Sequence, residues 1–249
     1  MPLPLLLPLN RCSDPHCEIL CFPHAGGSAS YFQRWTSHLP RGFSLRALQL
    51  PLRENRLDAE PLTRMRELIS LLLKEINALP DVPRVLFGHS MGAIVAWELA
   101  LSLEQQSRTP QHLFISGQQP PTFRRPTHFH QAADEVLIQE VARFAATPSS
   151  VFDFPDLREL VLAQLRHDYA LIERWQPTTA SRIAAPITVF HGREDTEVTL
   201  QQAQRWEDFT DNRFRWYSWP GAHFYLTTHW QALLERLCQS ASSPSLDMP

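Results

Sequence analysis

The stretch FGHSMGAIVAWELA, Phe87–Ala100, decides the fold of this 249-residue chain. It places Gly88 and Gly92, two of only 8 glycines, on either side of Ser90, although 21 prolines serve the other turns. The strand-like run RVLF precedes this Gly-x-Ser-x-Gly pattern, and the helix-like run AIVAWELA follows it. A strand-to-helix turn this sharp strains the serine backbone and demands very small neighbours. The pattern predicts a nucleophile elbow that displays Ser90; the alternative is a glycine-bracketed turn serine without chemistry.

Outward from this turn, strand-like and helix-like runs alternate, which is typical of a mostly parallel sheet with helices on both faces. Strands are expected at Glu18–Phe22, Phe43–Leu50, Arg84–His89, His112–Gly117, Ile187–Gly192 and Phe214–Trp219. Helices are expected at Ala29–Leu39, Leu62–Leu79, Gly92–Gln106, Thr199–Phe209 and from Phe224 to about Cys238. On the second of these helices the spacing predicts one packed face, made by Leu68, Leu71, Leu72, Glu75 and Ile76.

From about 118 to 177 the alternation stops, and two helical stretches, 133–146 and 155–175, replace it. Such an insertion predicts a helical lid over the carboxyl edge of the sheet, where open α/β sheets place their sites. Its helically spaced apolar residues are expected to pack on the core or line a pocket: Val136, Ile138, Val141, Phe144, Leu160, Leu165 and Leu171. We expect a single domain over 1–249, with an extended lead-in at 1–17 and a disordered tail at 240–249.

Composition excludes several classes of function. The net charge is −3, and the 23 basic and 26 acidic residues are scattered, so nucleic acid is not expected as a partner. The apolar opening MPLPLLLPLN is too short and too proline-rich for a membrane span or a signal peptide, so we expect a cytoplasmic protein without a membrane partner. Reduced structural thiols are favoured over a metal clip for the 4 cysteines, Cys12, Cys17, Cys21 and Cys238.

An elbow serine needs a base and an acid that orients it, and in this architecture both follow in chain order, acid first. His223, in PGAHF after the last strand, is the predicted base. His191 ends a strand before the acid, and His229 lies at least a helical turn beyond His223, so both are weaker candidates. The run ITVFHGREDTEV predicts Asp195 as the acid over its neighbour Glu194.

Glu197 of the same run is expected to be a first-turn charge of the next helix.

The oxyanion that forms when a serine attacks a carbonyl carbon needs two backbone donors. The Met91 amide follows the serine at a helix N-terminus, and the Ala25 amide in FPHAGGS is the predicted second donor. The alternative for the second donor is an ordinary strand-to-helix turn.

These segments together resemble the type II thioesterases, which are discrete α/β hydrolases that accompany nonribosomal peptide and polyketide synthases. The resemblance covers about Glu18 to Leu237 and rests on CFPHAGGSASYFQRW, FGHSMGAIVAWELA, LFISGQQPP, FHGREDTEV, PGAHFYL and the lid run LRELVLAQLRHDYALIERW. It implies an α/β-hydrolase fold with a lid. The family's nucleophile, acid and base fall on Ser90, Asp195 and His223, and its oxyanion amides on Ala25 and Met91.

The resemblance also implies a proofreading function, removal of stalled acyl groups from the phosphopantetheine arm of acyl or peptidyl carrier proteins. Because a serine–histidine–acid triad needs no metal or cofactor, we expect none beyond the arm that the substrate carries, and we expect a monomer. The chain departs from the family at LPLRENRL, where Leu52 replaces a glycine. We expect a short, permissive acyl pocket, and a solvated turn rather than a carrier contact at Arg124-Arg125.

Two other classes of function remain open on the sequence alone. An esterase or lipase of the same fold would act on a small free ester, and a hydrolase-like interaction module would have lost its activity. The presence of the serine, histidine and acid together with both glycine-rich turns argues against the interaction module.

Overall fold

The computed structural model describes residues 3–123, 126–144, 149–177 and 181–242. These residues form a seven-stranded sheet of order β1-β3-β2-β4-β5-β6-β7. The strands are β1 (Leu6–Pro8), β2 (Cys17–Phe22), β3 (Phe43–Leu48), β4 (Arg84–His89), β5 (His112–Ser116), β6 (Ile187–Gly192) and β7 (Phe214–Trp219). Each neighbouring pair is parallel except β1 and β3. The predicted fold class, a mostly parallel α/β-hydrolase sheet, is confirmed.

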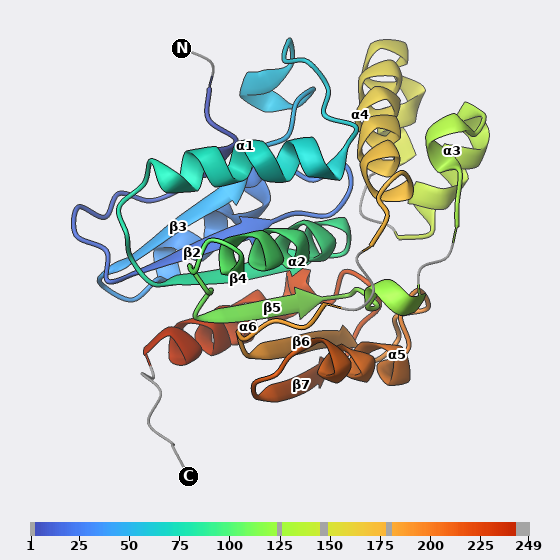
Figure 1. Cartoon of the computed structure of the whole chain (residues 1–249). Coiled ribbons are helices and arrows are strands. Elements are labelled where there is room, and N and C mark those ends of the chain that lie inside the picture. The colour runs from blue at the N-terminus through green and yellow to red at the C-terminus, as the bar shows by residue number, and fades with distance from the viewer. Residues whose placement is uncertain (1–2, 124–125, 145–148, 178–180, 243–249) are drawn as a thin grey trace.

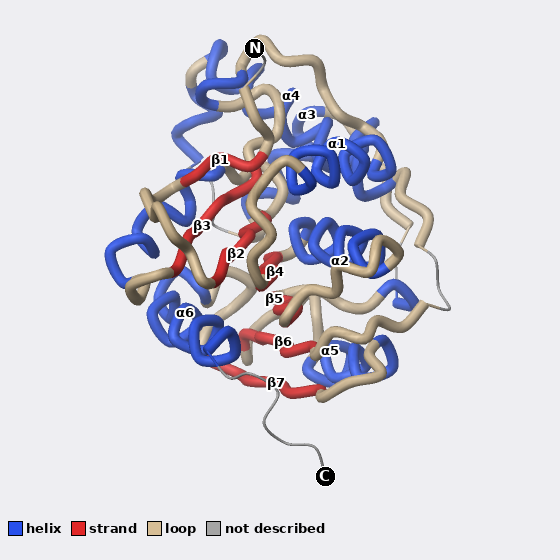
Figure 2. Tube along the Cα trace, turned by 60° about the vertical axis from the view of Figure 1, so that its left-hand side comes forward, coloured by secondary structure: helices blue, strands red, loops and turns tan. Residues whose placement is uncertain are grey.

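The described helices cover both faces of this sheet (Figures 1 and 2). They are α1 (Met65–Asn77), α2 (Met91–Glu104), α3 (Asp134–Ala142), α4 (Pro155–Glu173), α5 (Leu200–Gln204) and α6 (Leu226–Ser242). Short 3₁₀ segments occupy η1 (Ala29–His38), η2 (Glu54–Arg56), η3 (Pro121–Phe123), η4 (Phe129–Gln131), η5 (Ser149–Asp153) and η6 (Arg205–Phe209). Viewed along the sheet in Figure 2, α1, α2 and α5 lie on one face and α6 on the other.

Separate apolar clusters fill the two faces of the sheet. Helix α2 is buried nearly all round, and its Trp97 packs edge-on against Trp206 at 5.3 Å between ring centroids. On the opposite face Phe32 and Trp35 of η1 pack against Phe87 of β4. An apolar helix that is covered on all sides cannot shift easily, so α2 gives the residue that precedes it a rigid support.

Several element predictions need correction. The lead-in at 1–17 contains a strand, β1, which pairs antiparallel with β3, and the Glu75 carboxylate accepts the N–H groups of Leu5 and Leu6. The prediction that Leu71 belongs to the packed face of α1 is wrong, because Leu71 is 38% exposed while Ile69 is buried. The Ala29–Leu39 segment is 3₁₀ rather than α-helical, and α6 extends to Ser242, into the predicted tail.

The helical insertion between β5 and β6 contains α3 and α4, which lie beside the carboxyl ends of the strands (Figure 1). Leu137 and Val141 of α3 pack on Leu162 and Leu165 of α4 to form a small apolar cluster of their own. Leu171, near the end of α4, instead joins the main core beneath. The insertion is therefore attached to the domain at one end of α4 and has its own packing at the other.

No described helix is both long and apolar enough to cross a membrane. Within the described residues, no group of His, Cys, Asp and Glu side chains is arranged to hold a metal ion. Of the four cysteines, Cys17, Cys21 and Cys238 are buried and Cys12 is partly exposed. The pair Arg124-Arg125 and the tail after Ser242 lie outside the described residues.

Candidate active site

Ser90 stands at the junction of β4 and α2 with a backbone that few non-glycine residues adopt, φ 54° and ψ −123°. Its neighbours have no room for a side chain. A Cβ on Gly88 would lie 2.2 Å from the Gly92 carbonyl oxygen, and one on Gly92 would lie 2.0 Å from the Phe22 carbonyl oxygen. The predicted strained turn is confirmed, and the two glycines are where they are because backbone atoms surround them.

Asp195 and His223 meet at the carboxyl edge of the sheet, from the turns after β6 and β7. The Asp195 Oδ2 atom lies 2.9 Å from His223 Nδ1, and Oδ1 accepts the backbone N–H groups of Glu197 and Val198. Burial alone would raise the pKa of Asp195, but the hydrogen bond from His223 and these backbone donors outweigh it and lower the pKa. The ionised carboxylate therefore favours the tautomer of His223 with its proton on Nδ1, which leaves Nε2 free to act as a base.

Ser90 and His223 both line a cavity of about 480 Å³ beneath the lid. Ala25 and Met91 line the same cavity, so the structure gathers four of the five predicted site residues around one space. Asp195 is the fifth, and it lies behind His223 with its side chain fully buried. This arrangement matches the order of a serine–histidine–acid relay.

The turn His24–Gly27 after β2 forms one wall of the cavity. Gly26 adopts φ +78°, and the Gly27 N–H donates to the His24 carbonyl oxygen at 2.9 Å. Neither the Ala25 nor the Met91 backbone N–H donates to an acceptor on any described residue. Two free amides on the wall beside Ser90 are what an oxyanion requires.

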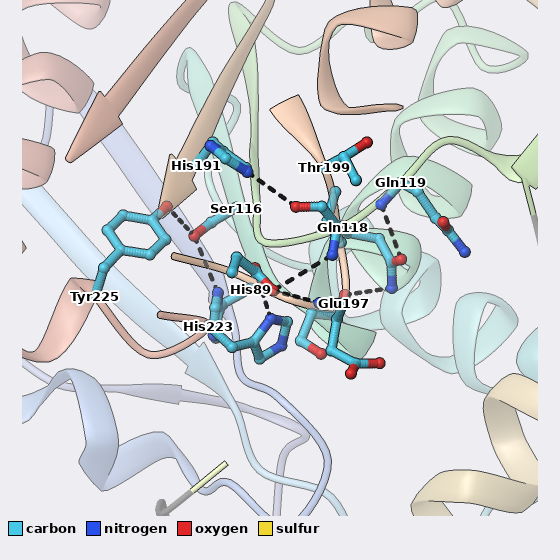
Figure 3. Close-up of polar contacts among 12 residues, drawn as sticks. His89, Ser116, Gln118, Gln119, His191, Glu197, Thr199, His223 and Tyr225 are labelled. Atoms are coloured by element: carbon cyan, nitrogen blue, oxygen red, sulfur yellow. Dashed lines mark hydrogen bonds and ion pairs between the residues drawn. The ribbon is translucent and has the colours of Figure 1, made fainter. Parts of the chain in front are cut away.

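The weaker candidates are engaged elsewhere. His191 Nε2 donates to the Val198 carbonyl oxygen at 2.9 Å, at the end of β6 shown in Figure 3. His229 Nε2 contacts the Pro220 carbonyl oxygen in an exposed position. The Glu194 carboxylate accepts the Gly221 N–H and so closes the turn before His223.

Glu197 corrects another prediction. Helix α5 begins only at Leu200, so Glu197 is not a first-turn charge; it lines the cavity and pairs with Arg143 of the lid. Arg143 also pairs with Glu140 on α3, at 2.7 Å. A charged cluster therefore lies at the cavity wall, where only apolar lid residues were expected. Nothing local in the sequence could signal it, because the partners are far apart along the chain.

Some of the predicted lid residues line the cavity and some do not. Val141, Phe144 and Leu165 face it, and the Phe144 ring lies 5.1 Å from the His223 ring. Val136 is 46% exposed and lies outside it. The lid thus contributes a partly aromatic, partly apolar wall directly above the histidine.

Two histidines that the sequence did not single out flank the site. Burial, followed by the charges of His223 and Arg53, lowers the pKa of His24 to about 3. Burial likewise holds the pKa of His89 well below its usual value, and His89 Nδ1 lies 3.0 Å from the Ser116 hydroxyl, which contacts Tyr225 (Figure 3). Its ring centroid lies 5.0 Å from that of His223. A neutral His89 can pack there without opposing the positive charge that a base acquires.

Leu52, which replaces a family glycine, has φ 66°. This left-handed conformation explains why a glycine would suit the position. The next residue, Arg53, is buried and pairs with Asp168 of α4. Neither Arg53 nor Asp168 was among the predicted site residues.

The fold and this arrangement define a class, the α/β hydrolases with a helical lid and a serine at the elbow. A family model described as a thioesterase domain matches residues 18–240. The chain belongs to the thioesterase family, and its predicted resemblance to type II thioesterases is confirmed.

The relatives agree over nearly the whole chain. This chain is 34% identical over 232 residues to the gramicidin S biosynthesis protein GrsT of Aneurinibacillus migulanus, and the match covers 92% of this chain and 91% of GrsT. The type II thioesterase BorB from the borrelidin biosynthetic cluster superposes with a TM-score of 0.87 at 30% identity, covering 95% and 97%. YbtT, a type II thioesterase from the yersiniabactin pathway, gives 0.86 at 27% identity, covering 96% and 100%. The chain is therefore a thioester hydrolase.

Proposed function

We propose that this enzyme removes stalled or wrongly loaded acyl groups from the phosphopantetheine arm of acyl or peptidyl carrier proteins in nonribosomal peptide or polyketide biosynthesis. Its relatives of known pathway support this assignment. The observation that carries the chemistry is the hydrogen bond of 2.9 Å between Asp195 and His223 in the cavity wall that also displays Ser90.

In the proposed reaction His223 Nε2 accepts the proton of the Ser90 hydroxyl as Oγ attacks the thioester carbonyl carbon. The oxyanion that forms accepts hydrogen bonds from the backbone amides of Ala25 and Met91. The C–S bond then breaks, and the sulfur leaves as the pantetheine thiol with the proton from His223.

A water molecule repeats the sequence on the acyl-Ser90 ester. His223 takes its proton, the hydroxide oxygen bonds to the acyl carbon, and collapse returns the proton to Oγ and releases the free acid. Asp195 stabilises the imidazolium in both halves without itself being protonated. This chemistry calls for no metal and no cofactor other than the arm of the substrate.

The cavity volume of about 480 Å³ supports a short, permissive acyl pocket. This volume lies in the range of cavities that hold small organic ligands. Hydrolysis rates over acyl-pantetheine thioesters of increasing chain length test the proposal. Rates that peak at short acyl groups support it, and a strong preference for long chains contradicts it. We further propose that the enzyme works as a monomer in the cytoplasm.

The decisive experiment is intact mass spectrometry of an acylated carrier protein incubated with wild type, Ser90→Ala and Ser37→Ala. Ser37 is an exposed serine on η1, away from the cavity, and serves as the matched control. Loss of the acyl mass is expected with wild type and Ser37→Ala and not with Ser90→Ala. Equal loss with all three contradicts the role of Ser90. The same acyl group presented as an oxygen ester separates this function from that of a carboxylesterase, which would hydrolyse the ester as fast.

A further inference from the structure

A buried ion pair connects the lid to the loop after β3. Arg53 Nη2 lies 2.7 Å from Asp168 Oδ1, and their side chains are 4% and 3% exposed. Asp168 belongs to α4, whose Gln164 also donates its amide to the Leu52 carbonyl oxygen. Helix α4 is thus held to this loop from within the protein rather than through surface contacts.

The other atoms of the pair hold the turn that carries the Ala25 amide. Asp168 Oδ2 accepts the Gly26 N–H at 2.7 Å, and Arg53 Nη1 donates to the Gly27 carbonyl oxygen at 2.7 Å. The Gly26 N–H is part of the peptide group that follows Ala25, so its bond to Asp168 fixes the rotation of that group. Gly26, at φ +78°, has no side chain of its own that could hold this conformation.

Stability alone is a weak reason for such a pair. Removing two charges from water costs several kcal/mol per ion, and a well-packed apolar replacement is often as stable or more so. The pair must therefore be judged by what it orients. Its bonds to Gly26 and Gly27 hold the turn that forms one side of the cavity lined by Ser90. The Ala25 amide, the predicted oxyanion donor, belongs to this turn and must keep its position during the reaction.

We propose that Arg53 and Asp168 are positioning residues that hold the Ala25 amide in place for the oxyanion, an inference that rests on the proposed function. The lid helix α4 is then part of the catalytic framework. A displacement of α4 from the turn would remove one oxyanion donor while leaving the Asp195–His223 hydrogen bond and the position of Ser90 in the cavity wall unchanged.

The test compares wild type with Asp168→Asn, which keeps the shape of the side chain and removes its charge. The control is Asp134→Asn, which breaks an ion pair to Arg166 on the same helix without touching the turn. In Asp168→Asn a partly misplaced donor should lower kcat by about ten- to a hundredfold and leave KM nearly unchanged. Complete removal of an oxyanion donor typically costs about a hundredfold or more. The control should stay within about twofold of wild type.

Two inhibitors separate positioning from a structural role. A trifluoromethyl ketone that adds to the serine forms an oxyanion, and its inhibition constant should rise by about the same factor as kcat/KM falls. A thioether analogue without the carbonyl should bind wild type and Asp168→Asn equally. An unchanged kcat overturns the proposal, and so does a lowered kcat with an unchanged constant for the ketone.

Folding is monitored by thermal denaturation. If Asp168→Asn does not fold, the double variant Arg53→Met/Asp168→Leu removes both charges together and is measured with the same two inhibitors. Wild type and Ser90→Ala are assayed in parallel. Failure of the wild type to hydrolyse thioesters would refute the proposed function itself, whereas an active wild type and a fully active Asp168→Asn refute only the positioning role.

Discussion

His112 at the start of β5 should make the protein sensitive to mild acid, because the ring is buried and cannot easily take a proton. Its Nε2 atom lies 2.8 Å from the Thr188 hydroxyl, and the ring stacks on Phe114 at 4.3 Å between centroids. Burial, followed by the positive charges of Arg213 and Arg215, lowers the pKa of His112 to about 3. The unfolded chain takes up this proton at a pKa of about 6.5.

The sign and size of the effect follow from proton linkage. Because the pKa is lower in the folded state, the unfolded state binds more protons below about pH 6.5, and stability falls as the pH falls. At about pH 5 the folded ring is still neutral, so the loss depends almost only on the unfolded pKa and amounts to about 2 kcal/mol from this one residue. The loss continues to grow until the pH approaches the folded value.

The assay is urea unfolding of wild type and His112→Gln at about pH 7.5 and about pH 5. The glutamine amide can keep a hydrogen bond to Thr188 but does not titrate. Buried His24 and His89 contribute equally in both proteins and cancel in the comparison. Wild type should lose about 2 kcal/mol more than the variant between the two conditions. Equal losses would show that the folded ring takes up a proton at little cost, which would refute the reasoning.

Three further changes test the site and its supports. Asp195→Asn should lower kcat by roughly a thousandfold or more, because the asparagine favours the wrong tautomer of His223, while urea unfolding stays close to wild type. Gly92→Ala should abolish hydrolysis and lower the melting temperature, since the added Cβ would lie 2.0 Å from the Phe22 carbonyl oxygen; an active, stable variant would contradict the packing. At Leu52, with φ 66°, Leu52→Gly should be more stable in urea than Leu52→Ala by about 1 kcal/mol, the reverse of the usual order.

The fold could be predicted because its signals are local. Each parallel strand is a short apolar run bounded by turn residues, and the elbow is complete within Gly88–Gly92. Strand β1 was missed because it has only 3 residues in a proline-rich segment, and its pairing with β3 is what makes it a strand. The exposed position of Leu71 shows the same limit, since helical spacing alone does not say which flank of α1 faces the sheet.

The gathering of Ser90, Asp195 and His223 was predictable because each follows a parallel strand, and the carboxyl ends of such strands share one edge. The pairs of Arg143 with Glu197 and of Arg53 with Asp168 were not, because side chains 54 and 115 residues apart have no common pattern in the chain. Such contacts depend on how the lid is placed over the sheet. The charged residues in the cavity wall therefore could not be predicted from the sequence.

Two unusual backbone conformations face the cavity, and they are maintained in different ways. Ser90 is held by its own neighbours, because Gly88 and Gly92 let β4, α2 and the Phe22 carbonyl group close around it. Gly26 is held by Arg53 and Asp168, which come from a distant loop and from the lid. A turn fixed by local packing leaves a signature in sequence, whereas a turn fixed by remote charges leaves only its glycines. For this physical reason the sequence reveals both Ser90 and the glycines that support it. It reveals the oxyanion turn at Gly26 but not Arg53 and Asp168, which hold that turn.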